Sequence, residues 1–185
     1  MAGIRITGGT RKGRRIAISR DGRTRYTPAK VRQAIFDLVG DIAGFDVLDL
    51  FAGAGSFTLE ALSRGAAGVT AVEKEARAAA LLRQNLRDLA LDKDCHVVNM
   101  DVRYAVPMLH RSEKRFDLIF ADPPYEMGYV AASLELLEAH PLCREGTVLI
   151  LEHSKREALG GPAEEKHGVR THRYGDTMLT MVMCG

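Results

Sequence analysis

The sequence predicts an α/β protein with a doubly wound, mainly parallel sheet of seven strands. Short apolar runs alternate along the chain with segments of helical periodicity, an order typical of a parallel sheet covered by helices. The length of 185 residues suits one domain, and a composition of 46% hydrophobic and 27% charged residues excludes a mainly disordered chain.

The N-terminal part, residues 1–44, is expected to be a small extension to the main domain at 45–185. Isoleucines alternate with polar residues on both sides of Gly8-Gly9, which predicts two short strands. Thr27-Pro28 is a helix-start signal, because Thr can cap a helix and Pro fits its first turn. An apolar face with helical spacing then continues, and Gly44 is expected to end the helix.

From residue 46 the expected strands and helices alternate. The run at 116–121 is apolar almost throughout, as in strands buried on both faces. The last segment predicts two antiparallel strands around the turn Tyr174-Gly175-Asp176. The expected strands are 47–51, 69–72, 97–98, 116–121, 148–151 and two within 167–183. The expected helices lie around 59–62 (closed by Gly65), 75–91, 105–109 and 130–137.

Charge is distributed unevenly along the chain. Residues 1–32 contain ten Lys or Arg and one acid, a net charge of +9, whereas the whole chain carries +2. The remainder therefore carries −7, and this contrast predicts a nucleic-acid contact in the basic part. The alternative is a solvated basic arm without a partner. The candidate contacts are Arg5, Arg11, Lys12, Arg14, Arg15, Arg25 and Arg32.

Several classes of protein are not indicated. The longest apolar runs have about five or six residues, whereas a membrane-spanning helix needs roughly 20. The start of the chain lacks the apolar stretch of a secretory signal, so we expect a cytoplasmic protein. The three cysteines, Cys95, Cys143 and Cys184, match no zinc pattern and are expected to be free thiols. The histidines are scattered, and we expect no metal site.

Three acidic residues mark a candidate ligand pocket. Asp49 lies in the strand before a turn with glycines at 53 and 55, where the backbone can approach a ligand closely. The dinucleotide fingerprint fails here, because Thr58 occupies its third glycine position. Glu73 and Asp101 follow the next two strands and could accept hydrogen bonds from a ribose and an adenine amino group. An ordinary turn with solvated strand-end charges is the alternative.

The tetrapeptide Asp122-Pro123-Pro124-Tyr125 directly follows the strand at 116–121. Its prolines stop the strand and hold the backbone rigid. The Asp122 carboxylate and the Pro123 carbonyl are two acceptors suited to the hydrogens of an amino group, and Tyr125 offers a flat face for a base. This motif predicts chemistry at an amino group on a flat ring, whereas the alternative is a loop that only ends a strand.

These motifs together resemble S-adenosylmethionine-dependent amino-methyltransferases. More closely, the chain is similar to the bacterial 16S ribosomal RNA guanine-N2 methyltransferases of the RsmD type, over nearly its whole length. The tetrapeptide is shared with DNA adenine and cytosine enzymes, so it does not specify guanine. The more specific matches are the N-terminal segment Arg5-Ile6-Thr7-Gly8-Gly9 with Lys12-Gly13-Arg14, and Ser63-Arg64-Gly65-Ala66. The resemblance closes on Arg173-Tyr174-Gly175-Asp176-Thr177.

The resemblance implies a Rossmann-like class I methyltransferase, a monomer that uses S-adenosylmethionine to methylate the 2-amino group of a guanine in 16S ribosomal RNA. It implies a substrate within the small ribosomal subunit or an assembly intermediate. The implied catalytic residues are Asp122, Pro123 and Tyr125. The implied cofactor-binding residues are Asp49, Phe51, Gly53, Gly55, Glu73, Lys74, Asp101 and Val102.

Three alternatives remain open. A DNA adenine-N6 or cytosine-N4 methyltransferase differs in its target base. A nicotinamide-dependent dehydrogenase would use a similar fold, but the failed third glycine and the tetrapeptide at 122–125 argue against it. A non-catalytic RNA-binding module would transfer no methyl group.

Overall fold

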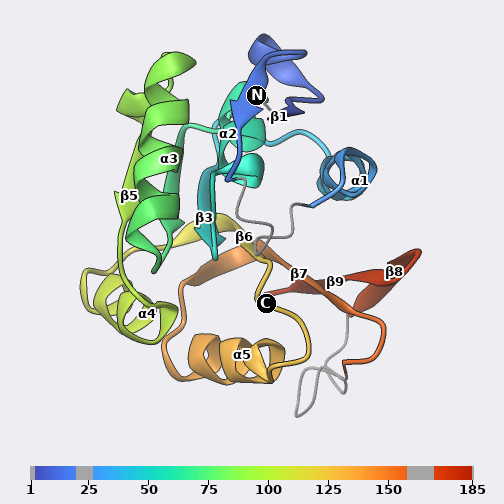
Figure 1. The fold of residues 1–185 in the computed structure, drawn as a ribbon. Helices are drawn as coiled ribbons and strands as arrows, with labels where there is room; N and C mark the ends of the chain where they lie inside the picture. Colours follow the sequence, from blue (N-terminus) through green and yellow to red (C-terminus); the bar gives the residue numbers. More distant parts are fainter. Residues whose placement is uncertain (1–2, 20–26, 158–168, 185) are drawn as a thin grey trace.

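A seven-stranded sheet with helices on both faces forms the centre of the molecule (Figure 1). It is seen in a computed structural model, which describes residues 3–19, 27–157 and 169–184. The first five strands across the sheet are parallel, and β9 is antiparallel to both of its neighbours. The predicted fold class is confirmed. The order across the sheet is β5 (Cys95–Val98), β4 (Gly68–Val72), β3 (Asp46–Leu50), β6 (Phe116–Ala121), β7 (Cys143–Ser154), β9 (Thr177–Met183) and β8 (Arg170–Tyr174).

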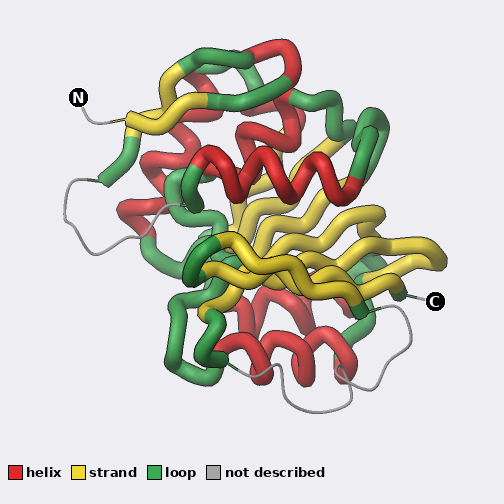
Figure 2. The backbone as a smooth tube through the Cα atoms, turned by 90° about the vertical axis from the view of Figure 1, so that its right-hand side faces the viewer, coloured by secondary structure: helices red, strands yellow, loops and turns green. Residues whose placement is uncertain are grey.

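The helices lie in two layers, above and below the sheet (Figure 2). Residues of α1 (Ala29–Val39), α2 (Ser56–Ser63) and α3 (Ala76–Asp88) belong to one apolar core. Residues of α4 (Val102–Arg111) and α5 (Tyr129–Ala139) belong to the other. Successive strand residues alternate between the two cores, because side chains of a strand point to opposite faces. No helix in the described parts of the chain is long and apolar enough to cross a membrane.

Helix α1 is shorter than predicted and begins differently. Pro28 is its N-cap residue, and no side chain caps the helix, so the expected cap by Thr27 is wrong. The helix stops at Gly40, whose φ of 86° is favourable for glycine, and not at Gly44. Ile42, which the predicted helix would have included, is buried in the loop that follows.

The basic N-terminal part forms a hairpin of β1 (Gly3–Arg5) and β2 (Arg15–Ala17), with the short 3-10 helix η1 (Gly9–Arg11) in its loop. The loop packs against the end of α2. The backbone N–H and hydroxyl of Thr7 donate to the carboxylate of Glu60, and Ser63 Oγ donates to the Gly8 carbonyl at 2.6 Å. A Cβ on Gly9 would overlap the carbonyl oxygen of Ser63, so this contact requires glycine.

The two predicted divisions of the chain, 1–44 and 45–185, share one apolar core. Ile6 and Ile16 of the N-terminal part are buried in the same cluster as α1, α2 and α3. On α3, Asn85 pairs with both the N–H and the carbonyl of Ala17, at 3.0 Å each. The division itself stays a prediction, but the hairpin is held firmly against the helices.

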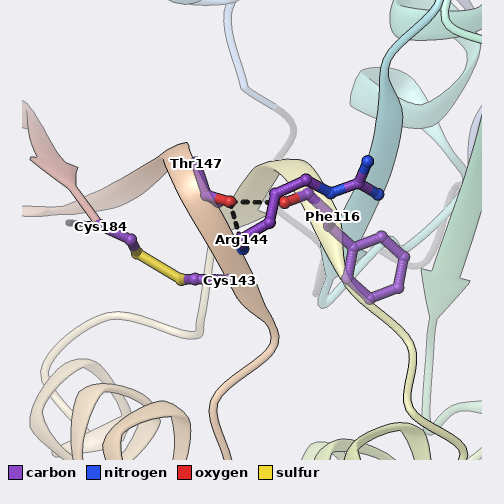
Figure 3. The surroundings of a disulfide bond; sticks show 5 residues. All are labelled: Phe116, Cys143, Arg144, Thr147 and Cys184. Carbon is purple, nitrogen blue, oxygen red and sulfur yellow. Dashed lines mark hydrogen bonds between the residues drawn. A yellow bond between two sulfur atoms is a disulfide. The ribbon is translucent and has the colours of Figure 1, made fainter.

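The C-terminal strands close one side of the sheet. The register pairs Tyr174 with Thr177, so Gly175 and Asp176 form the turn, as predicted. Cys143 at the start of β7 and Cys184 after β9 are joined by a disulfide, with their Cα atoms 6.3 Å apart (Figure 3). The expectation of three free thiols is therefore wrong for this pair, whereas Cys95 is free. A second 3-10 helix, η2 (Asp92–Asp94), precedes β5.

Candidate active site

A cavity of about 560 Å³ lies at the carboxyl ends of the five parallel strands. Each strand delivers an acidic side chain to it, because parallel strands end at the same edge of a sheet. The acids are Asp49, Glu73, Asp101, Asp122 and Glu152. Predicted site residues that line the cavity are Asp49, Phe51, Gly53, Glu73, Lys74, Asp101, Val102, Asp122, Pro123 and Tyr125.

The glycines of the turn after β3 serve two different purposes. Gly53 lines the cavity with a φ of +57°, and a Cβ built on it would meet no atom within 4 Å. Gly55 is buried beneath α3, where a Cβ would overlap the side chain of Leu82. The prediction of Gly55 as a cofactor contact is therefore wrong: its missing side chain allows α3 to approach the turn.

Asp49 is almost fully buried, with 1% of its surface exposed. Its Oδ2 accepts hydrogen bonds from the backbone N–H of Thr58 at 3.1 Å and from the Thr58 hydroxyl at 2.5 Å. Burial raises the pKa of Asp49 from 3.8 to about 7, while the bonds from Thr58 act in the opposite direction. Thr58 occupies the third glycine position of the dinucleotide fingerprint. Its backbone N–H and hydroxyl orient the Asp49 carboxyl group.

Glu73 follows β4 and is held by backbone amides. One of its carboxylate oxygens accepts the N–H of Gly53 at 2.7 Å, and the other accepts the N–H of Glu75 at 2.7 Å. A carboxylate oxygen has two lone pairs, so both oxygens can accept further hydrogen bonds. Glu73 can therefore hold a diol while its orientation is fixed by the turn after β3.

Asp101 caps α4 and is engaged by a neighbour. It accepts the N–H of Arg103 at 3.0 Å and forms an ion pair with the Arg103 guanidinium at 3.0 Å. The hydrogen bond from this side chain holds the pKa of Asp101 below its usual value. Arg103 also lines the cavity and was not predicted from the sequence.

The tetrapeptide after β6 is supported by two residues that the sequence reasoning missed. Thr27 Oγ1 donates to Asp122 Oδ2 at 3.1 Å. The Tyr125 hydroxyl donates to Glu152 Oε1 at 3.0 Å. Burial, with the nearby charge of Glu152, raises the pKa of the Tyr125 phenol well above its usual value, so this side chain is neutral. Glu152 directly follows the predicted strand at 148–151, so the strand-end rule could have found it.

The predicted RNA contacts fall into different environments. Arg5, Lys12, Arg14 and Arg15 are exposed on the hairpin. Arg11 is half-buried and donates to the Leu89 carbonyl at 2.9 Å. Arg25 lies outside the described residues.

Arg32 is fully buried, so its prediction as an RNA contact is wrong. Its guanidinium donates to the carbonyls of Thr27 at 2.7 Å and Arg5 at 2.6 Å, and lies 3.8 Å from the Glu60 carboxylate. Burial lowers the pKa of Arg32, while the charges of Glu60 and Glu152 raise it. The side chain therefore ties α1 to the hairpin and to α2.

The described residues show no cluster of side chains that indicates a metal site. Residues 3–19, 27–157 and 169–184 hold no group of three or more His, Cys, Asp or Glu side chains that could bind a metal ion. The acids of the cavity are spread over five strand ends, an arrangement suited to the separate polar groups of a nucleoside.

Comparison with known proteins places this chain in a family. A family model described as "Conserved hypothetical protein 95" matches residues 4–183. The Bacillus subtilis protein YlbH, named provisionally as an rRNA methyltransferase, is 32% identical over 94% of this chain and 95% of its own length. Ribosomal RNA small subunit methyltransferase D of Escherichia coli is 32% identical over 84% of this chain and 77% of its own.

Two solved structures share the fold of this chain. The hypothetical protein TTHA0928 of Thermus thermophilus is 31% identical, with a TM-score of 0.84, over 97% of this chain and 98% of that one. An RNA methyltransferase of Salinibacter ruber, solved in complex with S-adenosyl-L-homocysteine, shares the fold at 13% identity and a TM-score of 0.68. The chain belongs to the family described as conserved hypothetical protein 95, and the methyltransferase resemblance of its motifs is confirmed.

Proposed function

We propose that this protein transfers a methyl group from S-adenosylmethionine to the exocyclic 2-amino group of a specific guanine in small-subunit (16S) ribosomal RNA. The observation that carries the proposal is the placement of Asp122-Pro123-Pro124-Tyr125 in the wall of the same cavity as Asp49, Glu73 and Asp101. The ribosomal RNA methyltransferases among its relatives support the substrate class.

The chemistry of the cavity fits S-adenosylmethionine. The buried Asp49 carboxylate suits the ammonium group, and Glu73 suits the ribose hydroxyls. The open space at Gly53 admits a ligand against the backbone. Asp101, with Val102 beside it, suits the adenine ring and its amino group. The cofactor, when bound, supplies a methyl group on a sulfonium centre.

The residues of the tetrapeptide act on the acceptor. The lone pair of a base amino nitrogen is delocalised into the ring, which makes that nitrogen a poor nucleophile. Asp122 and the Pro123 carbonyl accept the amino hydrogens and so favour a more tetrahedral nitrogen, with its lone pair directed at the methyl group. Positioning of this kind is worth up to about 7–11 kcal/mol. Tyr125 stacks on the base after it leaves the RNA helix, which contributes roughly 1–3 kcal/mol.

The hairpin surface binds the RNA backbone in this proposal. Arg5, Lys12, Arg14 and Arg15 are exposed there and provide cations for phosphates, with Arg11 beside them. Arg25 remains a predicted contact. We place the protein in the cytoplasm, as a monomer that acts on the small ribosomal subunit or an assembly intermediate.

Methyl transfer to ribosomal RNA from cells that lack the gene tests the proposal. The expected product is N2-methylguanosine, with the methyl group on the 2-amino nitrogen. It is identified by mass spectrometry after transfer from labelled cofactor. An RNA with inosine at the target position should bind but accept no methyl group, because inosine lacks the 2-amino group while its ring and phosphates remain.

The other outcomes decide between the alternatives. Methyladenine or methylcytosine as product would favour the adenine-N6 or cytosine-N4 reading. Absence of transfer from a folded, cofactor-bound protein to any RNA would favour a non-catalytic RNA-binding module. Membership of a methyltransferase family already argues against the dehydrogenase.

A further inference from the structure

Glu152 is a second carboxylate beside the tetrapeptide. It lies in β7, the neighbour of β6, and pairs with Leu179 of β9 in the sheet register. Only 2% of its surface is exposed, yet it lines the cavity together with Asp122 and Tyr125. Burying a carboxylate costs free energy unless hydrogen bonds or an opposite charge compensate for the lost hydration. A buried carboxylate in the wall of a ligand cavity is therefore a candidate for contact with the ligand.

The surroundings of Glu152 keep it in place. Its Oε1 accepts the hydroxyl of Tyr125 at 3.0 Å, and the Arg32 guanidinium interacts with it electrostatically. The hydrogen bond to Glu152 holds the hydroxyl of Tyr125 in place. It thereby fixes the orientation of the ring on which we propose that the base stacks. Asp122 and Glu152 both line the cavity, and the charges of both act on the Tyr125 phenol, so both carboxylates lie near this ring.

The three candidate bases differ at the ring nitrogen next to the amino group. In guanine the 2-amino group lies between N1, which carries a hydrogen, and N3, which does not, so the N1 side presents two adjacent donors. In adenine N1 and in cytosine N3, the ring nitrogen beside the amino group is a bare acceptor. A carboxylate accepts hydrogen bonds only, so it attracts the guanine edge and repels the other two. Asp122 alone cannot make this distinction, because all three bases present an amino group.

We propose that Glu152 selects guanine by accepting the hydrogen on N1, while Asp122 and the Pro123 carbonyl hold the adjacent 2-amino group. This inference rests on the proposed function and adds a specificity-determining residue to it. Guanine gains a hydrogen bond from N1 to Glu152. Adenine and cytosine are also disfavoured, because their bare ring nitrogen would face the buried carboxylate.

The test compares guanine with 2-aminopurine at the target position of the RNA. 2-Aminopurine keeps the 2-amino group that accepts the methyl, but its N1 carries no hydrogen. The measured quantity is the ratio of kcat/KM for the guanine RNA to kcat/KM for the 2-aminopurine RNA. In Glu152→Gln this ratio should fall about ten- to a hundredfold from the wild-type value, since a charge-assisted hydrogen bond to N1 is lost. The missing O6 of 2-aminopurine affects both proteins alike and cancels between them.

Tyr125→Phe is the matched control, because it removes the Tyr125–Glu152 hydrogen bond and keeps the carboxylate. It should lower turnover on both RNAs and leave the ratio unchanged within about twofold. A ratio that falls equally in Tyr125→Phe would show that Glu152 only positions Tyr125 and would overturn the proposal. An unchanged ratio in Glu152→Gln would overturn it too, with the guanine-N2 activity of the wild type intact.

Folding of Glu152→Gln is checked by its thermal unfolding midpoint and by cofactor binding. Glu152→Asp replaces it if the glutamine variant does not fold, since it keeps the buried charge but withdraws the carboxylate by one methylene group. Its ratio is also expected to fall. A wild-type protein that methylates neither RNA would overturn the proposed function, and with it this inference.

Discussion

The hydroxyl of Thr27 donates a hydrogen bond to the carboxylate of Asp122, at 3.1 Å between Oγ1 and Oδ2. The two residues are 95 positions apart in the chain, and Thr27 is buried. The bond joins the segment before α1, which follows the basic hairpin, to the tetrapeptide after β6. A donor on one oxygen fixes the plane of the carboxylate and leaves lone pairs for an amino group. Thr27 is therefore a positioning residue for Asp122.

Thr27→Val should lower kcat about ten- to a hundredfold, because valine has nearly the shape of threonine but cannot donate this hydrogen bond. The estimate follows from about 1.5–3 kcal/mol for a hydrogen bond to a charged group. Cofactor affinity, measured by calorimetry, should change little, since Thr27 supports the acceptor side of the cavity. Thr27→Ser keeps the hydroxyl and should retain most of the activity. A valine variant with wild-type kcat would remove Thr27 from the positioning of Asp122.

The raised pKa of Asp49 predicts a specific dependence of stability on pH. Between about pH 4 and pH 7 the folded protein holds a proton on Asp49 that the unfolded chain has released. Stability is therefore lost as the pH rises through this window. Asp49→Asn removes the effect, so the variant should gain about 2–3 kcal/mol relative to wild type between pH 5 and pH 8. Urea unfolding at both pH values measures this gain, and an equal difference at both would show that Asp49 is ionised throughout.

The sequence predicted the cavity because of a property of parallel sheets. Once the strands were placed, the acids at the ends of four of them had to meet at one edge, and Asp49, Glu73, Asp101 and Asp122 do so. Thr27 could not be predicted in the same way, because its partner is 95 positions away and a threonine before a helix ordinarily caps it.

For Arg32 and Gly55 the predicted contacts are wrong, because residue type alone does not show where a residue lies in the fold. Arg32 was grouped with the basic residues of the N-terminal part. It precedes Phe36 by four positions, and so shares the buried face of α1 with that residue. Gly55 was assigned to the cofactor because glycines allow close approach of a ligand, but the group that approaches is the Leu82 side chain. The spacing to Phe36 indicates the buried position of Arg32, whereas the approach of Leu82 to Gly55 depends on tertiary packing, which neither composition nor spacing records.

Arg32→Met should destabilise the fold strongly, by about 3–5 kcal/mol, because it leaves buried carboxylates without their cation. Glu60 keeps a second ion pair with Arg64 at 3.0 Å, so the loss should fall toward the lower end of that range. Lys30→Met is the matched control: it is exposed on the same helix and should change stability little. Chemical denaturation of both variants measures the difference. Equal stabilities would show that Arg32 does not hold α1 to the hairpin.

Neutralising the exposed hairpin cations should weaken RNA binding and flatten its dependence on salt. In the variant Lys12→Gln, Arg14→Gln, Arg15→Gln, each lost phosphate contact should reduce the slope of log affinity against log salt by about 0.7–0.9. These side chains are exposed, and the cavity is built at the strand ends, so cofactor binding should persist.

The control for this surface removes the same charge elsewhere. Arg111 and Lys114 are exposed and Arg115 is half-exposed; they lie at the end of α4 and between α4 and β6. Helix α4 belongs to the apolar core on the other face of the sheet from the core that holds Ile6 and Ile16 of the hairpin region. Their replacement by Gln should alter long-range attraction only slightly and leave the salt slope near the wild-type value, because screening limits such effects to about 10 Å at 0.1 M salt. Filter binding over a range of salt concentrations distinguishes the two variants. If both lower the slope equally, net charge and not the hairpin surface governs RNA affinity.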